Sequence, residues 1–210
     1  MFHKDSFIIE PQTFSLIQEL QKNEFLKNFH LVGGTSLALM IGHRNSIDID
    51  LFTTEDFSTE KLEEQVLKNF EYFKTNEDEN TLMCVINGVK TDFLKHNYPL
   101  INQPITENNI RFLSKEDIAA MKLNAIAKSG KRIKDFIDIY YLLEYFSLKQ
   151  MLEFYQIKYP KSNPLIALKA LQYFDDINEN IDYPKLRKPL PLKIIKKRIE
   201  ESVSKINKIF

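Results

Sequence analysis

The sequence predicts an α+β protein, with an N-terminal half of alternating helices and strands and a C-terminal half of helices alone. Before residue 112, short apolar runs typical of strands alternate with stretches of helical spacing. Asn87-Gly88 between two such runs is a strong hairpin signal. From Ser114 onward the helical period dominates. We therefore expect an α/β core over residues 1–112 and a helical domain over 113–210.

In the N-terminal half, Pro11 suits a helix start and the apolar residues after it recur at helical spacing. Gly42 suits the residue that ends a short helix. The expected elements are a helix over 11–27, a strand over 29–32, one or two helical turns over 35–41, a strand over 47–52, a helix over 58–70, and strands over 81–86 and 89–95.

In the C-terminal half, Ser114 followed by Asp117 resembles a capped helix start. Gly130 separates the first two helices, and a cluster of prolines introduces the last. The expected helices cover 115–128, 132–146, 149–158, 163–174 and 191–207.

Composition excludes several classes of protein. Hydrophobic residues make up 43% of the 210, enough for a real core, so wholesale disorder is excluded. Cys84 is the single cysteine, which excludes an intramolecular disulfide framework and a Cys-rich zinc site. The N-terminus shows no secretory signal, and no run of about 18 apolar residues exists. We expect a cytoplasmic protein that has no membrane partner.

A formal net charge of zero hides local charge runs. Residues 55–79 carry nine acids against three bases, 118–134 carry five bases and no acid, and 185–208 carry nine bases against two acids. Basic runs either attract phosphates or are ordinary solvated helix faces. The runs alone leave both interpretations open.

Two aspartates in an otherwise apolar strand are the main chemical signal. Side chains two apart in a strand share a face, so Asp48 and Asp50 face one way while Ile47, Ile49 and Leu51 face the other. Neighbouring carboxylates repel each other, and a divalent cation such as Mg²⁺ removes that repulsion. The pair is therefore a candidate metal site for a nucleotide.

Two further features extend this hypothesis. Asp92 lies in the strand expected over 89–95, and it can face the same cleft if that strand pairs with the Asp48–Asp50 strand. Three carboxylates can hold two metal ions for in-line displacement at phosphorus. The turn Gly33-Gly34 exposes backbone N–H groups, with the Thr35 and Ser36 hydroxyls beside it, as in a phosphate cradle. The alternative is a tight strand-to-helix turn whose hydroxyls merely cap the helix.

Three separated segments resemble the AbiEii-type nucleotidyltransferase-like toxins, a branch of the polymerase-β-like nucleotidyltransferase superfamily. They are GGTSLALMIGHRNSIDIDLF (33–52), VKTDFLKHNYP (89–99) and AAMKLNAIAKSGKRIKDFIDIYYLL (119–143). The match covers roughly residues 29–143. The chain is short for this family, and acceptor specificity would lie in its reduced helical half.

The resemblance implies a mixed or antiparallel sheet with flanking helices, followed by a helical domain. It implies that Gly33, Gly34, Thr35 and Ser36 contact nucleotide phosphates, and that Asp48, Asp50 and Asp92 hold Mg²⁺, with Mn²⁺ as the alternative. It places Lys122 near the triphosphate and makes Asp135 the late aspartate of the catalytic set.

The residues themselves leave alternatives for the later segment. Asp135 and Asp138 lie off the buried stripe of their helix, so they fit a surface face with ion pairs Lys131–Asp135 and Lys134–Asp138. Lys122 also fits a lysine at the edge of the core.

The remaining polar candidates are weaker. Arg44 would pair with Asp48 or a phosphate, or lie in a polar loop. We interpret His30 and His96 as structural and Cys84 as packed in a strand, and we see no Ser-His-Asp triad or zinc motif.

The leading functional hypothesis is a bacterial nucleotidyltransferase that uses an NTP and Mg²⁺. Its acceptor would be RNA, such as a tRNA 3′ end, or a protein side chain. The basic segments would favour RNA if they line one groove. The resemblance adds the role of a toxin in a toxin–antitoxin or abortive-infection system, with a cognate antitoxin as partner. The alternatives are an inactive nucleotide-, RNA- or partner-binding module and a nucleotide-sugar glycosyltransferase; the latter normally needs a larger sugar-binding domain.

Overall fold

The computed structural model describes residues 2–177 and 183–210. By their internal contacts they form two compact units. The α/β unit comprises Met1–Tyr98 and Gln103–Leu113, and the helical unit comprises Pro99–Asn102 and Ser114–Phe210. The chain thus passes between the units three times. The division into an α/β core over residues 1–112 and a helical domain over 113–210 remains our prediction.

The α/β unit is built on a mixed sheet in the order β3-β4-β5-β2-β1-β7-β6. The strands are β1 (His30–Leu31), β2 (Ile49–Thr53), β3 (Tyr72–Asp78), β4 (Thr81–Ile86), β5 (Val89–Lys95), β6 (Ile105–Glu107) and β7 (Ile110–Phe112). Two pairings are parallel, β2 with β5 and β1 with β7, and the others are antiparallel. The sheet is therefore of the mixed type that the family resemblance implies.

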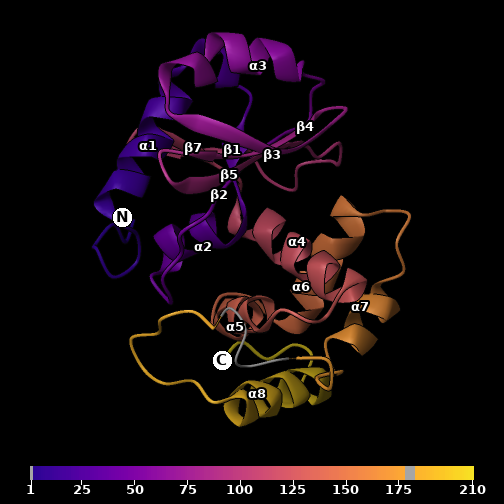
Figure 1. Cartoon of the computed structure of the whole chain (residues 1–210). Helices are drawn as coiled ribbons and strands as arrows, with labels where there is room; N and C mark the ends of the chain where they lie inside the picture. Colours follow the sequence, from indigo (N-terminus) through magenta and orange to yellow (C-terminus); the bar gives the residue numbers. More distant parts are fainter. Residues whose placement is uncertain (1, 178–182) are drawn as a thin grey trace. The chain divides into compact units, whose positions relative to one another are not determined.

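Helices of the α/β unit flank this sheet (Figure 1). They are α1 (Pro11–Lys22), α2 (Gly33–Ile41) and α3 (Thr59–Gln65), with 3-10 turns at Glu24–Leu26 and Leu67–Asn69. Leucines and isoleucines of α1 and α3 pack with Ile49, Leu51 and Phe93 in one hydrophobic core. Since alternate strand residues face opposite ways, Asp50 and Asp92 belong to the other face of the sheet.

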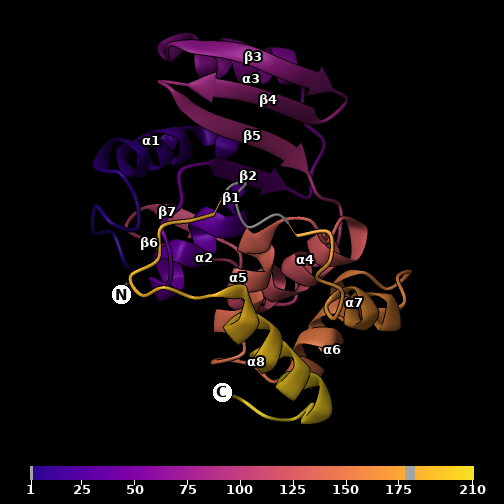
Figure 2. The same cartoon turned by 60° about the horizontal axis from the view of Figure 1, so that its bottom comes forward.

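The helical unit contains α4 (Lys115–Lys128), α5 (Ile133–Leu142), α6 (Leu148–Lys158), α7 (Pro164–Ala170) and α8 (Leu192–Ser204). Helix α4 packs against α5, α6 and α7, and α8 packs against α5 (Figure 2). The predicted cap at Ser114 is confirmed, since its side chain accepts a hydrogen bond from the N–H of Asp117. None of the helices in the described ranges is both long and apolar enough to cross a membrane.

Local turn predictions are confirmed, while some element ends differ. Gly42 ends α2 with φ 65°, and Asn87 and Gly88 have φ 49° and 80° in the β4–β5 hairpin. The first helix ends at Lys22 instead of residue 27, because the backbone of Asn23 is extended. The strand expected over 47–52 begins only at Ile49, and Ile47 lies outside it and is 53% exposed. Helix α4 has the predicted bounds, and α2 and α6 begin one or two residues earlier than predicted. The remaining helices, α3, α5, α7 and α8, are shorter by a few residues, as frayed ends usually are.

Candidate active site

Two of the predicted carboxylates lie side by side on adjacent strands. In the parallel ladder of β2 and β5, Asp50 is the register partner of Asp92. The sequence-based condition that the 89–95 strand pairs with the Asp48–Asp50 strand is therefore met. Asp48 immediately precedes β2 and lies two residues before Asp50. The fold therefore brings Asp50 and Asp92 together on neighbouring strands, with Asp48 just before β2.

Gly33 makes room for the Asp50 carboxylate. It is the first residue of α2 and has φ 68°, in the left-handed region that favours glycine. A Cβ at this position would lie 2.2 Å from Asp50 Oδ2. The N–H of Val32 donates to the Asp50 carbonyl at 2.9 Å, which holds the two segments together. The glycine turn and the Asp-Ile-Asp segment thus form one local structure.

Gly34 makes room for the Arg44 guanidinium in the same way. A Cβ at residue 34 would lie 2.2 Å from Arg44 Nη2. Arg44 is buried, and its Nη1 donates to the Asn45 carbonyl at 2.8 Å. Arg44 thus lies in the loop between α2 and β2, as one of the two interpretations has it, and its side chain is buried there. The guanidinium lies at the N-terminus of α2, where the sequence predicts phosphate binding.

The hydroxyls of Thr35 and Ser36 are both buried in α2. Thr35 Oγ1 donates to the Asp48 carbonyl and lies 2.8 Å from Ser46 Oγ. Thr35 therefore fixes the backbone that carries the first aspartate, and its phosphate contact would come from its N–H group. Ser36 Oγ has no hydrogen-bond partner in the structure. No side chain caps the N-terminus of α2, so its first N–H groups suit an anion.

Asp92 is a buried carboxylate whose charge is poorly compensated. Its Oδ1 is buried and has no hydrogen-bond partner, while Oδ2 lies 3.5 Å from the Nζ of the largely exposed Lys90. Burial raises the pKa of Asp92, Lys90 opposes that rise, and the nearby charge of Asp48 adds to it. A cation between these carboxylates would remove the repulsion between them and give Asp92 Oδ1 the partner that it lacks.

Within the described ranges, no three His, Cys, Asp or Glu side chains converge as a ready-made metal site. The donor chemistry nevertheless fits a hard divalent cation. Asp48 and Asp50 offer oxygen ligands from one segment, and the unpartnered Asp92 Oδ1 lies on the adjoining strand. Mg²⁺ commonly takes only one or two carboxylates and completes its shell with water and phosphate.

The helical unit holds the other two predicted site residues in a buried ion cluster. Lys122 Nζ of α4 lies 2.7 Å from Asp135 Oδ1 and 2.7 Å from Asp138 Oδ2, both on α5. All three side chains are buried. The interpretation of Asp135 and Asp138 as an exposed face is wrong, because α4 covers that face. The local i,i+4 rule misses this contact, since Lys122 comes from another helix.

A second buried ion pair in this unit was not predicted. Lys158 Nζ of α6 lies 2.8 Å from Asp117 Oδ1, and both side chains are 0% exposed. The carboxylate of Asp117 also accepts from the N–H groups of Ile101 and Asn102, and Lys158 donates to the Pro99 carbonyl. The pair thus fastens residues 99–102 to α4 and α6. No local sequence pattern links positions 41 residues apart.

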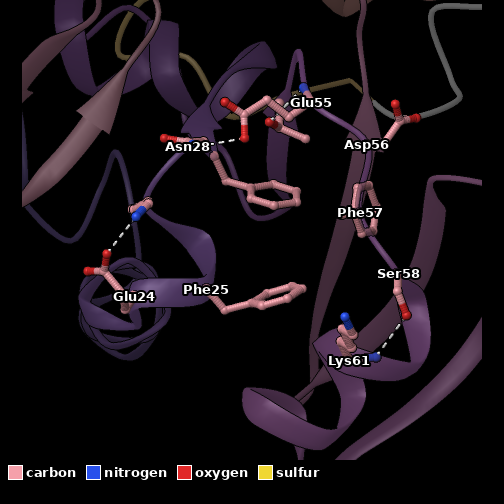
Figure 3. Close-up of a pocket in the computed structure, with 11 residues that line it drawn as sticks. Glu24, Phe25, Asn28, Glu55, Asp56, Phe57, Ser58 and Lys61 are labelled. Carbon is pink, nitrogen blue, oxygen red and sulfur yellow. Dashed lines mark hydrogen bonds and ion pairs between the residues drawn. The ribbon is translucent and has the colours of Figure 1, made fainter.

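A pocket of about 350 Å³ lies at the opposite end of β2, beside Thr53. Figure 3 shows the Phe25 ring extending toward the segment of Phe57 and Ser58, with Asn28 hydrogen-bonded to Glu55. None of the predicted site residues lines this pocket. The predicted chemistry therefore lies elsewhere, at the start of β2.

Cys84 packs in β4 as predicted. Burial raises the pKa of its thiol to about 12, which keeps the thiol protonated and unsuited to nucleophilic attack.

Solved structures with a similar fold include a candidate nucleotidyltransferase from Helicobacter pylori, with a TM-score of 0.61 at 15% identity, covering 94% of this chain and 95% of that one. MenT4, a nucleotidyltransferase toxin from Mycobacterium tuberculosis H37Rv, has a TM-score of 0.59 at 14% identity, covering 90% of this chain and 80% of that one. These likenesses support the fold.

Sequence comparison identifies relatives directly. An uncharacterized protein of Aquifex aeolicus (strain VF5) is 32% identical over 160 residues, which cover 73% of this chain and 77% of that protein. The family model described as nucleotidyl transferase AbiEii toxin, type IV TA system, matches residues 15–99 and 83–207. Because this match spans most of the chain, the protein belongs to the AbiEii family of nucleotidyltransferase toxins and is a nucleotidyltransferase.

Proposed function

We propose that the protein transfers a nucleotidyl group from an NTP to an RNA acceptor such as a tRNA 3′ end, with Mg²⁺ held by Asp48 and Asp50. Asp92 completes the site and helps to activate the acceptor hydroxyl. The observation that supports this proposal most is that Asp50 and Asp92 are register partners on adjacent parallel strands, beside the uncapped N-terminus of α2. When bound, the metal would neutralise charge on the phosphates and on the attacking oxygen.

The phosphates would lie at the N-terminus of α2. The backbone N–H groups of Gly33, Gly34 and Thr35 point there without a side-chain cap, and the helix dipole favours an anion. Ser36 has a buried hydroxyl in the same turn. Lys122 and Asp135 enter the proposal through the family resemblance, with Lys122 as the cation that meets the triphosphate.

An RNA acceptor is favoured by how charge divides between the two units. Residues 114–210 carry 19 Lys and Arg against 12 Asp and Glu, whereas residues 1–113 carry 10 against 17. Both basic runs of the sequence lie in the helical unit: one covers most of α4 and the start of α5, and the other covers α8, which packs on α5. The Arg198 guanidinium of α8 lies 3.6 Å from the ring centroid of Tyr140 on α5. A basic surface attracts the phosphates of RNA.

Family membership supports a role as a toxin whose activity stops growth. A cognate antitoxin, a bacterial cytoplasm as the site of action, and Mg²⁺ over Mn²⁺ belong to this proposal. The acceptor alternative, a protein side chain, uses the same nucleotide site.

The test is incubation of the purified protein with each α-³²P-labelled NTP, Mg²⁺ or Mn²⁺, and total bacterial RNA. The inactive comparison is Asp48→Asn/Asp50→Asn. A matched control is Asp56→Asn, which removes an exposed carboxylate of the same unit that pairs with Lys95. We expect label in a tRNA-sized band with wild type and with Asp56→Asn, and none with the double variant.

Other outcomes contradict parts of the proposal. Label on protein would replace RNA by a side chain as acceptor. Nucleotide binding without transfer under every metal and NTP would support the inactive binding module. Equal transfer by the Asp48→Asn/Asp50→Asn variant would remove the carboxylates from the mechanism.

A further inference from the structure

We infer that Asp138 is a positioning residue for the proposed nucleotidyl transfer, acting by fixing the ammonium group of Lys122. The inference rests on the proposed function, in which Lys122 meets the triphosphate. It adds a residue for which the family resemblance gave no role.

The geometry couples Asp138 to Lys122 directly. Asp135 and Asp138 are three residues apart on α5, so their side chains share a face of that helix. Each places one carboxylate oxygen 2.7 Å from Lys122 Nζ, which comes from α4. Asp138 is 0% exposed and Asp135 is 4% exposed. The ammonium is therefore held from two directions by charge-assisted contacts.

Stability alone does not account for this cluster. Burying three charged groups carries a desolvation cost, and apolar residues of similar volume often stabilise a core at least as well. The Lys158–Asp117 pair has an evident structural task, because both partners also bind backbone groups of residues 99–102. Asp138 instead places its Oδ2 2.7 Å from the cation of the cluster, Lys122 Nζ.

Fixing a lysine matters when it must meet a phosphate. A lysine side chain has several rotatable bonds and loses their freedom when it binds, so holding it in place beforehand lowers the cost of binding. Preorganised charges are also more effective than charges that must reorient. Loss of Asp138 should therefore raise KM for NTP more than it lowers kcat.

The experiment measures steady-state transfer at varied NTP for wild type, Asp138→Asn, Lys122→Met and the double variant Lys122→Met/Asp138→Asn. We expect Asp138→Asn to raise KM for NTP by about 10-fold, as loss of a residue that orients a ligand-binding group typically does, with kcat much less affected. The double variant should match Lys122→Met, because Asp138 acts through Lys122. Unchanged KM in Asp138→Asn, or effects that simply add in the double variant, would overturn the inference.

Asp138→Glu gives a second route if Asp138→Asn folds poorly. It keeps the negative charge but moves the carboxylate by one methylene, so a positioning role predicts a raised KM and a purely structural role predicts the wild-type KM. Asp117→Asn is the matched control: it weakens the other buried ion pair and should lower Tm while leaving KM for NTP unchanged.

The two failures are distinguishable. If wild type neither transfers a nucleotide nor binds NTP, the proposed function fails and this inference fails with it. If wild type transfers a nucleotide and the Asp138 variants keep its KM, only the positioning role fails.

Discussion

Asp92 and Asp138 are both buried aspartates, yet their surroundings differ. Asp138 is matched by the Lys122 ammonium at 2.7 Å, whereas Asp92 reaches the exposed Lys90 only at 3.5 Å and leaves Oδ1 without a partner. The chain thus places a cation in close contact with Asp138 and leaves one carboxylate oxygen of Asp92 without a partner. Sites that await an external cation are expected to look like Asp92, and sites that orient a cation already present look like Asp138.

Asp50→Asn should sharpen this contrast most. It removes one of the two proposed metal ligands, and losing several kcal/mol of charge stabilisation corresponds to a fall of about 1,000-fold in transfer rate. Thermal melting should show an intact fold, so the loss would be chemical. Labelled-NTP transfer measures it, and a variant within tenfold of wild type would contradict the metal assignment.

Lys158→Met should have the largest effect on stability. It leaves Asp117 buried without its cation, which costs about 3–5 kcal/mol, or a fall in Tm of about 6–20 °C for a chain of this size. Lys205→Met is the control, since its pair with Glu201 is largely exposed and should change Tm by no more than about 2–4 °C. Equal Tm values for the two variants would mean that burial does not separate these ion pairs.

Gly33→Ala should damage the nucleotide site through its geometry. The added Cβ would collide with Asp50 Oδ2, and a displacement of about 1 Å at a reacting group can cost about 100-fold in rate. Gly88→Ala is the matched control, because Gly88 has φ 80° and nothing within 4 Å of the added Cβ. Both variants should lose some stability from the left-handed backbone, and only Gly33→Ala should lose activity. Loss of activity in both would mean that backbone strain, and not the collision, is responsible.

Asp92→Asn should stabilise the metal-free fold slightly. The folded-state pKa of Asp92 is raised, so the protonated form favours folding and that contribution is lost as pH rises through the folded pKa. At pH 7 in EDTA, the variant should melt higher, by on the order of 2–4 °C for each kcal/mol recovered, and the gain should shrink toward pH 4.

Added Mg²⁺ provides the converse test. It should raise the Tm of wild type through binding to the native state and should raise that of Asp92→Asn less. A lower Tm for the Asp92→Asn variant at pH 7 in EDTA would show that ionised Asp92 stabilises the fold. That result would contradict the comparison of Asp92 with Asp138.

Local chemistry accounts for what the sequence could predict. The Asn87-Gly88 hairpin, the Gly42 helix end and the Asp48–Asp50 pair each depend on residues close in the chain. The edge strand β3 was missed because it is mostly exposed and lacks apolar alternation, and β6 and β7 have only three residues each.

The burial of Asp135, Asp138 and Arg44 escaped prediction for a different reason. Each depends on a partner brought in by the fold: α4 covers the two aspartates, and the glycine turn opens a place for the guanidinium. Spacing rules along one helix or loop carry no information about such partners.

The attachment of residues 99–102 to the helical unit bears on how this protein can evolve. Because Asp117 and Lys158 hold a segment that belongs, along the chain, to the α/β half, the helical unit is not a continuous cassette. Recombination at a single point after residue 113 would leave this segment behind and place two buried charges beside a foreign loop. New surface properties of the helical unit are therefore expected to arise by substitution more readily than by exchange of the whole unit.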